Sequence, residues 1–409
     1  MAVSTEETVR KEACMSFEMI AKTLQGLEGI LADELRELGA EQVQEGCRSV
    51  SFRGDKAMLY KANFHCRTAL RILLPLVEFK VVEPSHIYDA LSQFEWSKYM
   101  QPTMSFVVDT VAYSSCVTNT RFACYRVKDA VVDYWKKKGD IRPAVNAESP
   151  DLYLHLHVSE DKATLSLDSS GESLHKRGYR VVQLETPLNE VLAAGLILLT
   201  GWRGETNFID PMCGSGTFLT EAAMIALNIP PGMYRKSFAF EKWLDFDAGL
   251  FAEISEDDSK ERPFDFCCYG YDISPMAVDA TKKNVESAGL SQYVKVSRRP
   301  LQLFSDPPLP AILVTNPPYG ERLKVRDLTE VYKLLGERLK HQFTGGSAWV
   351  LGYRDECFVQ IGLHPSAKFH VFNGQLPCEF RSYELFAGTN KEHKTLMAQS
   401  FTPKKGGTR

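Results

Sequence analysis

A glycine-containing turn between a short strand and an apolar helix constrains this fold more than any other feature of the sequence. Residues 207–209 are typical of a strand that ends at Asp210, and residues 218–227 have the composition of a buried helix. Gly214 and Gly216 in the turn let the backbone approach a ligand closely beside a helix N-terminus. No lysine follows the last glycine, and the third glycine of G-x-G-x-x-G is missing, so a P-loop and a nicotinamide site are both disfavoured.

The rest of the second half alternates strands and helices, which is typical of a mostly parallel α/β sheet. The predicted elements are strand 266–271, helix 275–288, strands 294–297 and 311–315, helix 329–342, strand 348–352 and a closing antiparallel pair at 368–373 and 381–387. Asp272 follows the first of these strands, where an acidic side chain commonly holds ribose hydroxyls. Because the carboxyl ends of parallel strands meet at one edge, we expect Asp272 near the glycine turn.

A stiff loop follows the strand predicted at 311–315, and it reads Asn316-Pro317-Pro318-Tyr319. The prolines cannot donate backbone hydrogen bonds, so the strand ends here. The Asn316 side-chain oxygen and the Pro317 carbonyl can each accept one N–H of an exocyclic amine, and Tyr319 can stack on the ring that carries it. With both hydrogens held, the nitrogen lone pair points outward as a nucleophile. A plain turn rich in Asn and Pro is the alternative.

These three loops favour a site for a nucleoside ligand and a planar amine at one sheet edge. S-adenosylmethionine fits, because its ribose suits Asp272 and its methionine end suits the glycine turn. The candidate residues for binding it are Asp210, Pro211, Cys213, Gly214, Ser215, Gly216, Thr217 and Asp272. The candidate catalytic residues are Asn316, Pro317, Pro318 and Tyr319.

The first half has a different pattern. Residues 17–80 follow a strand–helix–strand–strand–helix–strand order, which predicts a small ferredoxin-like α+β unit. Residues 81–168 form a second small unit, with a basic helix predicted at 122–138. That basic face is a candidate for gripping a phosphate backbone, although a solvated surface would look the same. The candidate RNA-binding residues are Arg121 and Lys128 on the basic face of this helix, and His175, Lys176, Arg177 and Arg180 in the segment that links the two halves.

Composition limits the class of protein. The chain has 409 residues, enough for two or three domains, and its net charge of -4 excludes bulk basicity as a nucleic-acid signal. The ten cysteines include no CxxC pair, so neither a zinc site nor a disulfide framework is expected. No apolar run approaches the length of a membrane span, and residues 1–16 form a polar leader. We expect a cytoplasmic protein without metal, ending in a basic, disordered tail at 391–409.

The second half resembles class I S-adenosylmethionine-dependent methyltransferases that act on amines, whose signature is Asn/Asp-Pro-Pro-Tyr. The whole chain resembles the THUMP-containing bacterial methyltransferases that modify guanine N2 in large-subunit (23S) ribosomal RNA. The resemblance rests on residues 174–180, 210–217 and 316–323, and a stretch at 128–133 is similar to the THUMP helix of that family. It implies a Rossmann-like, mostly parallel seven-stranded sheet preceded by ferredoxin-like and THUMP modules. The implied division is 17–80 ferredoxin-like, 81–168 THUMP, 169–187 linker and 188–390 methyltransferase.

Several alternatives stay open. The residues do not distinguish guanine from adenine as the target, so a DNA or RNA adenine-N6 methyltransferase remains possible. A protein-glutamine methyltransferase and a non-catalytic RNA-binding assembly factor are two further alternatives. Cys213 and Cys378 invite comparison with the nucleophile of 5-methylcytosine enzymes, but a structural role is favoured. Residues 229–262 interrupt the α/β pattern as an insertion of partly helical content and unknown role. Residues 298–301 lack the acid that many relatives place against the adenine amine.

Overall fold

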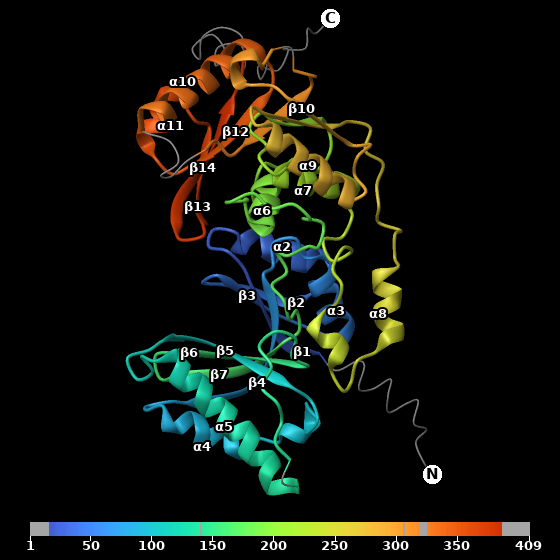
Figure 1. Ribbon diagram of the computed structural model, residues 1–409, viewed down its shortest axis with the longest axis vertical. Coiled ribbons are helices and arrows are strands. Elements are labelled where there is room, and N and C mark those ends of the chain that lie inside the picture. The colour runs from blue at the N-terminus through green and yellow to red at the C-terminus, as the bar shows by residue number, and fades with distance from the viewer. Residues whose placement is uncertain (1–15, 140, 306, 319–324, 387–409) are drawn as a thin grey trace, which may run out of the picture. The chain divides into compact units, whose positions relative to one another are not determined.

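A computed structural model describes residues 16–139, 141–305, 307–318 and 325–386 of the chain (Figure 1). The predicted tail, and the predicted leader apart from Ser16, lie outside these residues. The chain forms two compact units. The first comprises Met1–Gly178 and Pro230–Lys260, and the second comprises Tyr179–Ile229 and Glu261–Arg409. No helix in the described ranges has both the length and the apolar character that crossing a membrane requires.

The first unit begins with the predicted ferredoxin-like order. Its elements are β1 (Phe17–Lys22), α2 (Glu28–Glu37), β2 (Glu41–Gly46), β3 (Ser49–Gly54), α3 (Lys56–His65) and β4 (Arg71–Lys80). Local chemistry explains where α3 starts, because the Asp55 side chain accepts a hydrogen bond of 2.9 Å from the Met58 backbone N–H. The continuation contains α4 (Ser85–Ser92), η1 (Trp96–Lys98), β5 (Phe106–Tyr113), α5 (Thr120–Gly139), β6 (Leu152–Ser159) and β7 (Lys162–Asp168).

All seven strands of the first unit form one sheet, in the order β2-β3-β1-β4-β7-β6-β5. The join is the antiparallel pair of β4 with β7, which runs from Leu73 opposite Asp168 to Lys80 opposite Lys162. Two hydrophobic cores pack on this sheet. One, around Trp96, includes buried residues of α4 and α5, and the other contains Leu31 and Phe52. The predicted boundary between 80 and 81 therefore separates two cores but not two sheets, since β4 belongs to both.

The insertion predicted within the methyltransferase domain belongs to the first unit instead. It carries η2 (Ala239–Lys242) and α8 (Ala248–Ser255). Phe240 is fully buried, and its ring stacks on that of Tyr60 with 4.5 Å between centroids. The Tyr60 hydroxyl in turn accepts a hydrogen bond of 3.0 Å from the backbone N–H of Asp247. Residues 230–260 lie within the predicted 188–390 domain but pack in the first unit, where their aromatic side chains complete the ferredoxin-like core.

The second unit is a seven-stranded sheet in the order β10-β9-β8-β11-β12-β14-β13. Its elements are α6 (Glu190–Leu199), β8 (Asn207–Asp210), α7 (Thr217–Leu227), β9 (Cys268–Asp272), α9 (Pro275–Ser287), β10 (Val294–Arg298), η3 (Leu301–Leu303), β11 (Ala311–Thr315), α10 (Val325–Gln342), β12 (Ser347–Gly352), α11 (Asp355–Ile361), β13 (Ala367–Asn373) and β14 (Leu376–Glu384). The pairs β10–β9, β9–β8, β8–β11 and β11–β12 are parallel, and β14 runs antiparallel to both of its neighbours. The predicted mostly parallel sheet and closing hairpin are confirmed. Helix α11 was not predicted.

Candidate functional site

Three loops singled out from the sequence leave one edge of the second sheet. Strand β8 lies between β9 and β11, and all three run parallel. Asp210 pairs with Gly270 in the register of β8 with β9, and Ile209 pairs with Leu313 in that of β8 with β11. Their carboxyl ends therefore bring the glycine turn, Asp272 and Asn316 to neighbouring positions at the edge where α/β sheets bind ligands.

Helix α9 holds the glycine turn in place. Gly216 precedes α7 with φ of 83°, and a Cβ there would lie 2.4 Å from the Thr281 Cγ2 atom. A side chain at this position is excluded by both backbone conformation and space. The Thr281 hydroxyl donates a hydrogen bond of 2.8 Å to the Gly214 carbonyl, which fastens the turn to the helix. The backbone of the glycine turn is therefore held in one conformation by α9.

The Asp272 carboxylate lies against the glycine turn, as predicted. One oxygen accepts the backbone N–H of Gly214 at 3.0 Å, and the other accepts that of Ser274 at 2.8 Å. Each carboxylate oxygen has a further lone pair. Asp272 can therefore order the turn and still accept hydrogen bonds from two neighbouring hydroxyl groups, as a ribose requires.

Asp210 is nearly fully buried, and the structure gives it a role inside the protein. Its Oδ1 accepts hydrogen bonds from the Thr315 hydroxyl at 2.8 Å and from the Met212 backbone N–H at 3.1 Å. Burial raises the pKa of Asp210 to about 7, the two hydrogen bonds oppose this rise, and the nearby Asp272 charge adds to it. The side chain joins the end of β8 to the end of β11, directly before Asn316.

Asn316 is half-buried at the start of the loop, Pro317 is buried and Pro318 is exposed. The Oδ1 atom of Asn316 is itself buried and accepts no hydrogen bond within the described residues. An acceptor left in this state costs about 1–3 kcal/mol, so a ligand donor at this point would be stabilised. Tyr319, the fourth predicted catalytic residue, lies outside the described residues.

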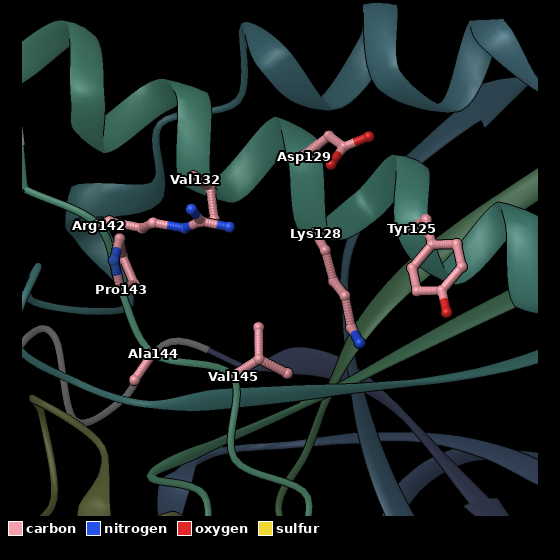
Figure 2. Close-up of a pocket in the computed structure, with 8 residues that line it drawn as sticks. All are labelled: Tyr125, Lys128, Asp129, Val132, Arg142, Pro143, Ala144 and Val145. Carbon is pink, nitrogen blue, oxygen red and sulfur yellow. The ribbon is translucent and has the colours of Figure 1, made fainter.

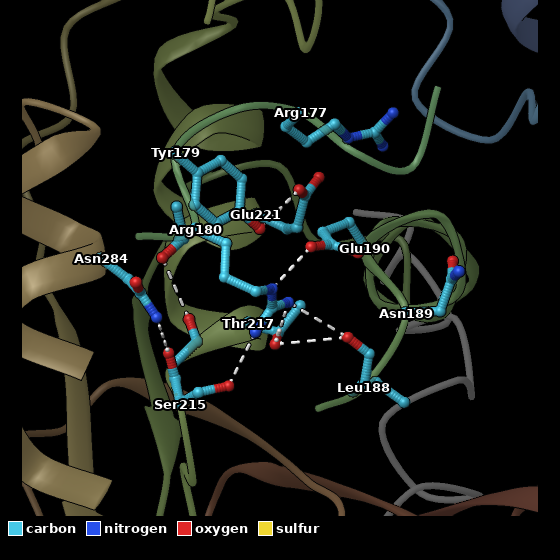
Figure 3. Close-up of polar contacts among 12 residues, drawn as sticks. Arg177, Tyr179, Arg180, Leu188, Asn189, Glu190, Ser215, Thr217, Glu221 and Asn284 are labelled. Carbon is cyan, nitrogen blue, oxygen red and sulfur yellow. Dashed lines mark hydrogen bonds and ion pairs between the residues drawn. The ribbon is translucent and has the colours of Figure 1, made fainter. Parts of the chain in front are cut away.

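Arg180 holds the glycine turn in place, and its contacts within the protein occupy the side chain that was predicted to touch RNA. Its side chain is 12% exposed and lies 2.7 Å from Oε1 of Glu190, which is 8% exposed. The guanidinium also donates to the Ser215 and Thr217 hydroxyls, at 2.8 and 2.9 Å (Figure 3). Arginine presents several donors in a fixed fork, which suits it to join α6 to the turn. The Ser215 and Thr217 hydroxyls each accept a hydrogen bond in this contact, which fixes both side chains within the turn.

Asn284 of α9 adds a second fixed point to the same turn. Its side-chain N–H group donates to the Ser215 carbonyl at 3.1 Å, and its oxygen accepts the backbone N–H groups of Val181 and Val182, each at 2.9 Å. Asn284 is fully buried, so these bonds replace the water that its amide would otherwise bind. The turn and the segment that carries Arg180 are thereby tied to one helix.

The other three residues of the connecting segment that were predicted to contact RNA differ in burial and charge. Arg177 is 2% exposed and donates to the Leu174 carbonyl at 2.9 Å, so the prediction that it touches RNA is wrong. Burial, with the nearby Arg177 charge, lowers the pKa of His175 to about 4, so this ring is neutral near pH 7 and supplies no positive charge. Lys176 is exposed and pairs with Glu172 at 2.5 Å.

Arg121 and Lys128 both lie on α5 in the first unit, Arg121 exposed near the start of the helix and Lys128 half-buried farther along. Lys128 also lines a cavity of about 420 Å³. These two side chains remain candidates for contact with a phosphate backbone.

Neither cysteine considered as a nucleophile is suited to that role. Burial raises the pKa of Cys213 well above its usual value, and the carboxylates of Asp210 and Asp272 raise it further. Burial also raises the pKa of Cys378, which lies near the start of β14. Both thiols are therefore protonated at neutral pH, which favours the structural role. Among the described residues, no group of three or more His, Cys, Asp or Glu side chains is arranged to hold a metal ion.

The edge next to Asp272 is apolar and cationic. Ile273 directly follows Asp272 and is 62% exposed. Its backbone carbonyl accepts a hydrogen bond of 3.0 Å from Arg298, and Arg299 lies over the Tyr271 ring at 5.0 Å from the centroid. An adenine bound here would meet the Ile273 side chain and backbone groups.

Sequence reasoning missed four side chains that build the site: Glu190, Thr281, Asn284 and Thr315. Thr315 carried a usable signal, because it is the only polar residue in the buried strand 311–315 and a buried hydroxyl needs a partner. The other three lie on helices whose packing partner was unknown.

Comparison with known proteins matches the whole described architecture. Residues 18–73 match the family described as the RlmL ferredoxin-like domain, residues 84–168 match the THUMP domain, and residues 177–382 match the family described as "RMKL-like, methyltransferase domain". The chain is 38% identical over 387 residues to the "Ribosomal RNA large subunit methyltransferase K/L" of Cellvibrio japonicus, an alignment that covers 91% of this chain and 51% of the relative. The chain thus spans about half the length of the K/L relatives it matches.

Two further relatives match along nearly their full length. The "Putative RNA methyltransferase slr0064" of Synechocystis is 35% identical over 90% of this chain and 96% of that protein. The crystal structure of "SMU.472, a putative methyltransferase complexed with SAH" superposes with a TM-score of 0.82 at 29% identity, covering 91% of this chain and 99% of that one. The predicted fold of a class I S-adenosylmethionine-dependent methyltransferase behind ferredoxin-like and THUMP modules is confirmed, and the chain belongs to the RMKL-like methyltransferase family.

Proposed function

We propose that the protein transfers a methyl group from S-adenosylmethionine to the exocyclic amine of an RNA base, namely guanine N2 of 23S ribosomal RNA. The observation that carries the chemistry is the buried Oδ1 of Asn316, which accepts no hydrogen bond within the described residues. Asn316 directly follows β11, and the neighbouring strand β8 leads into the glycine turn. A buried acceptor beside a nucleoside-binding edge is suited to an N–H donor on a second ligand.

S-adenosylmethionine supplies a methyl group on a positively charged sulfur. The protein's part is to hold its ribose at Asp272, its adenine along Ile273 and its methionine end at the glycine turn. SAH, the form left after methyl transfer, is present in the structure of one similar protein, which supports this use of the site. The carboxylate of Asp272, which lies against the glycine turn, also gives the site a negative potential suited to a cationic donor.

Asn316 and the Pro317 carbonyl each accept one hydrogen of the target amine. This leaves the nitrogen lone pair directed at the methyl group, and both acceptors stabilise the positive charge that develops on nitrogen. Holding the reacting atoms about 3–3.5 Å apart in line contributes several kcal/mol. The alkylated amine then loses its proton to water, so the site needs no strong base.

The RNA part of the proposal is supported by the THUMP match at residues 84–168 and by the printed names of the K/L relatives. A base within a helix is out of reach, so the target is unpaired or is flipped out at a cost of a few kcal/mol. We expect Arg121 and Lys128 to contact the phosphate backbone, and the protein to act in the cytoplasm with its ribosomal substrate.

The test is methyl transfer from labelled S-adenosylmethionine to large-subunit RNA that lacks the modification, followed by digestion to nucleosides. We expect label in N2-methylguanosine. Label in N6-methyladenosine would assign the same loop to adenine, and transfer to duplex DNA would replace the RNA assignment. Binding of S-adenosylmethionine without transfer to any of these would favour a non-catalytic assembly factor.

A further inference from the structure

A cavity of about 420 Å³ opens on the first unit between α5 and the segment 142–145, far along the sequence from the methyltransferase loops. Its size falls within the range of about 300–1,000 Å³ typical of small-ligand pockets. Figure 2 shows Tyr125 and Lys128 extending from α5 toward the segment that carries Val145, while Arg142 reaches toward Val132.

The far wall of this cavity is fixed to the sheet. The Phe106 backbone N–H donates to the Ala144 carbonyl at 3.0 Å, and the Asn146 N–H donates to the Phe106 carbonyl at 3.1 Å. Phe106 also forms a parallel bridge with Val145. Because β5 is at the end of the strand order, these bonds add the segment to an otherwise open edge. The cavity is therefore formed before any ligand arrives.

Two cations of this cavity are available to a ligand. Within the described residues, neither Lys128 nor Arg142 forms a hydrogen bond or an ion pair, and Lys128 only lies over the Tyr125 ring at 5.4 Å. The one acidic residue of the lining, Asp129, is paired with Arg126 at 2.7 Å. The local charge is positive and unsatisfied, although the chain as a whole is acidic.

The remaining lining is apolar or aromatic. Tyr125 is 47% exposed and Val145 is 46% exposed, so both offer apolar surface to a ligand in this cavity. Val132, Pro143 and Ala144 complete this surface. An exposed ring beside free cations is the combination with which proteins bind single-stranded nucleic acid.

We propose that this cavity binds one unpaired nucleotide of the RNA substrate, with its phosphate between Lys128 and Arg142 and its base against Tyr125 and Val145. The inference rests on the proposed function for the presence of RNA, but not on the chemistry at Asn316. A nucleotide in a duplex keeps its base stacked and paired, so a concave apolar site selects a single-stranded segment near the modified base.

The experiment measures binding of labelled single-stranded RNA, and of a duplex of the same length, to the full chain by fluorescence anisotropy. We expect K128A/R142A to weaken single-strand binding about 10-fold or more and to lower the slope of log K against log salt by about 0.7 for each phosphate that is no longer neutralised. Y125A should weaken it about 10-fold at an unchanged salt slope, whereas Y125F should bind normally. The matched control is K137A, because Lys137 is exposed on α5 half a turn around the helix from Lys128.

The outcomes separate this inference from the proposed function. If K128A/R142A binds RNA as well as K137A does, the cavity is not the site. Equal losses for single strand and duplex would make it a general basic surface and overturn the selection of an unpaired nucleotide. A wild-type chain that binds no RNA would overturn the proposed function as well. The melting temperature and the S-adenosylmethionine affinity of each variant should equal those of the wild type, which shows that the variant is folded. If K128A/R142A is unstable, K128Q/R142Q repeats the test.

Discussion

Thr315 donates a hydrogen bond of 2.8 Å from its hydroxyl to Oδ1 of Asp210, across two neighbouring parallel strands. Both side chains are buried at the carboxyl ends of their strands. Thr315 precedes Asn316, and Asp210 begins the glycine turn. This one bond therefore joins the loop proposed to bind the target amine to the turn proposed to bind S-adenosylmethionine. We therefore expect the relative position of the two ligands to depend on a contact that neither ligand touches.

Removing the Thr315 hydroxyl should weaken the connection between the Asn316 loop and the glycine turn. In Thr315→Val, Asp210 keeps only the Met212 N–H on Oδ1, which costs about 1–3 kcal/mol of stability. We expect kcat to fall about 10-fold or more, because methyl and amine lose their alignment. Thr315→Ser keeps the hydroxyl and should behave as the wild type in melting and single-turnover assays. Equal kcat for the valine and serine variants would argue against the bond's positioning role.

Replacing Asn316 by alanine should remove catalysis and spare donor binding. The loss of one acceptor for the developing charge corresponds to about 10²–10³-fold in kcat. Asn316→Asp keeps an oxygen acceptor at the same place and should retain measurable turnover. Calorimetry with S-adenosylmethionine supplies the control, since its affinity should be unchanged. Wild-type kcat in the alanine variant would show that the role assigned to Asn316 is wrong.

The raised pKa of Asp210 predicts a pH dependence of stability. The folded unit holds this proton up to about pH 7, whereas the unfolded chain releases it near its ordinary value of 3.8. The stability that Asp210 contributes is therefore full below pH 4 and is lost as pH rises through 7. Asp210→Asn should raise the melting temperature at pH 8 by roughly 5 °C and leave it nearly unchanged at pH 4. Parallel melting curves for the two proteins across this range would contradict the assignment.

Arg180 should affect the donor rather than RNA. Arg180→Gln leaves the buried Glu190 without its ion-pair partner, which costs about 3–5 kcal/mol, and releases the side chains of Ser215 and Thr217. We expect weaker binding of S-adenosylmethionine and an unchanged salt dependence of RNA binding. The matched comparison is Lys176→Gln, which removes one exposed charge four residues earlier and should leave donor affinity intact.

The insertion should contribute to the stability of the first unit. Phe240→Ala removes a fully buried ring that stacks on Tyr60, and the cost should be about 3–5 kcal/mol. Exposed Leu244 in the same segment is the control, because Leu244→Ala should change stability little. Chemical unfolding followed by tryptophan fluorescence compares the two variants. Similar midpoints would mean that the insertion does not support this core.

Local patterns in the sequence were sufficient to predict the succession of strands and helices and the three loops that follow strands β8, β9 and β11. Gly214, Asp272 and Asn316 were found because each follows a strand, and parallel strands carry their ends to one side. Helix α11 escaped because it spans only Asp355–Ile361, too short for a periodic pattern to stand out.

The sequence by itself determined what depends on neighbours in the chain: periodicity, turn chemistry and the residue types offered at strand ends. Only the tertiary structure decided what depends on distant partners. It buried Arg177 and gave the Arg180 guanidinium to Glu190 and the glycine turn, although both arginines had looked like a basic linker. It also took the aromatic residues of 230–260 into the ferredoxin-like core and joined two predicted modules through β4. The residue type alone does not tell whether a charged or aromatic side chain lies in water or in a core. That depends on which surface folding brings against it.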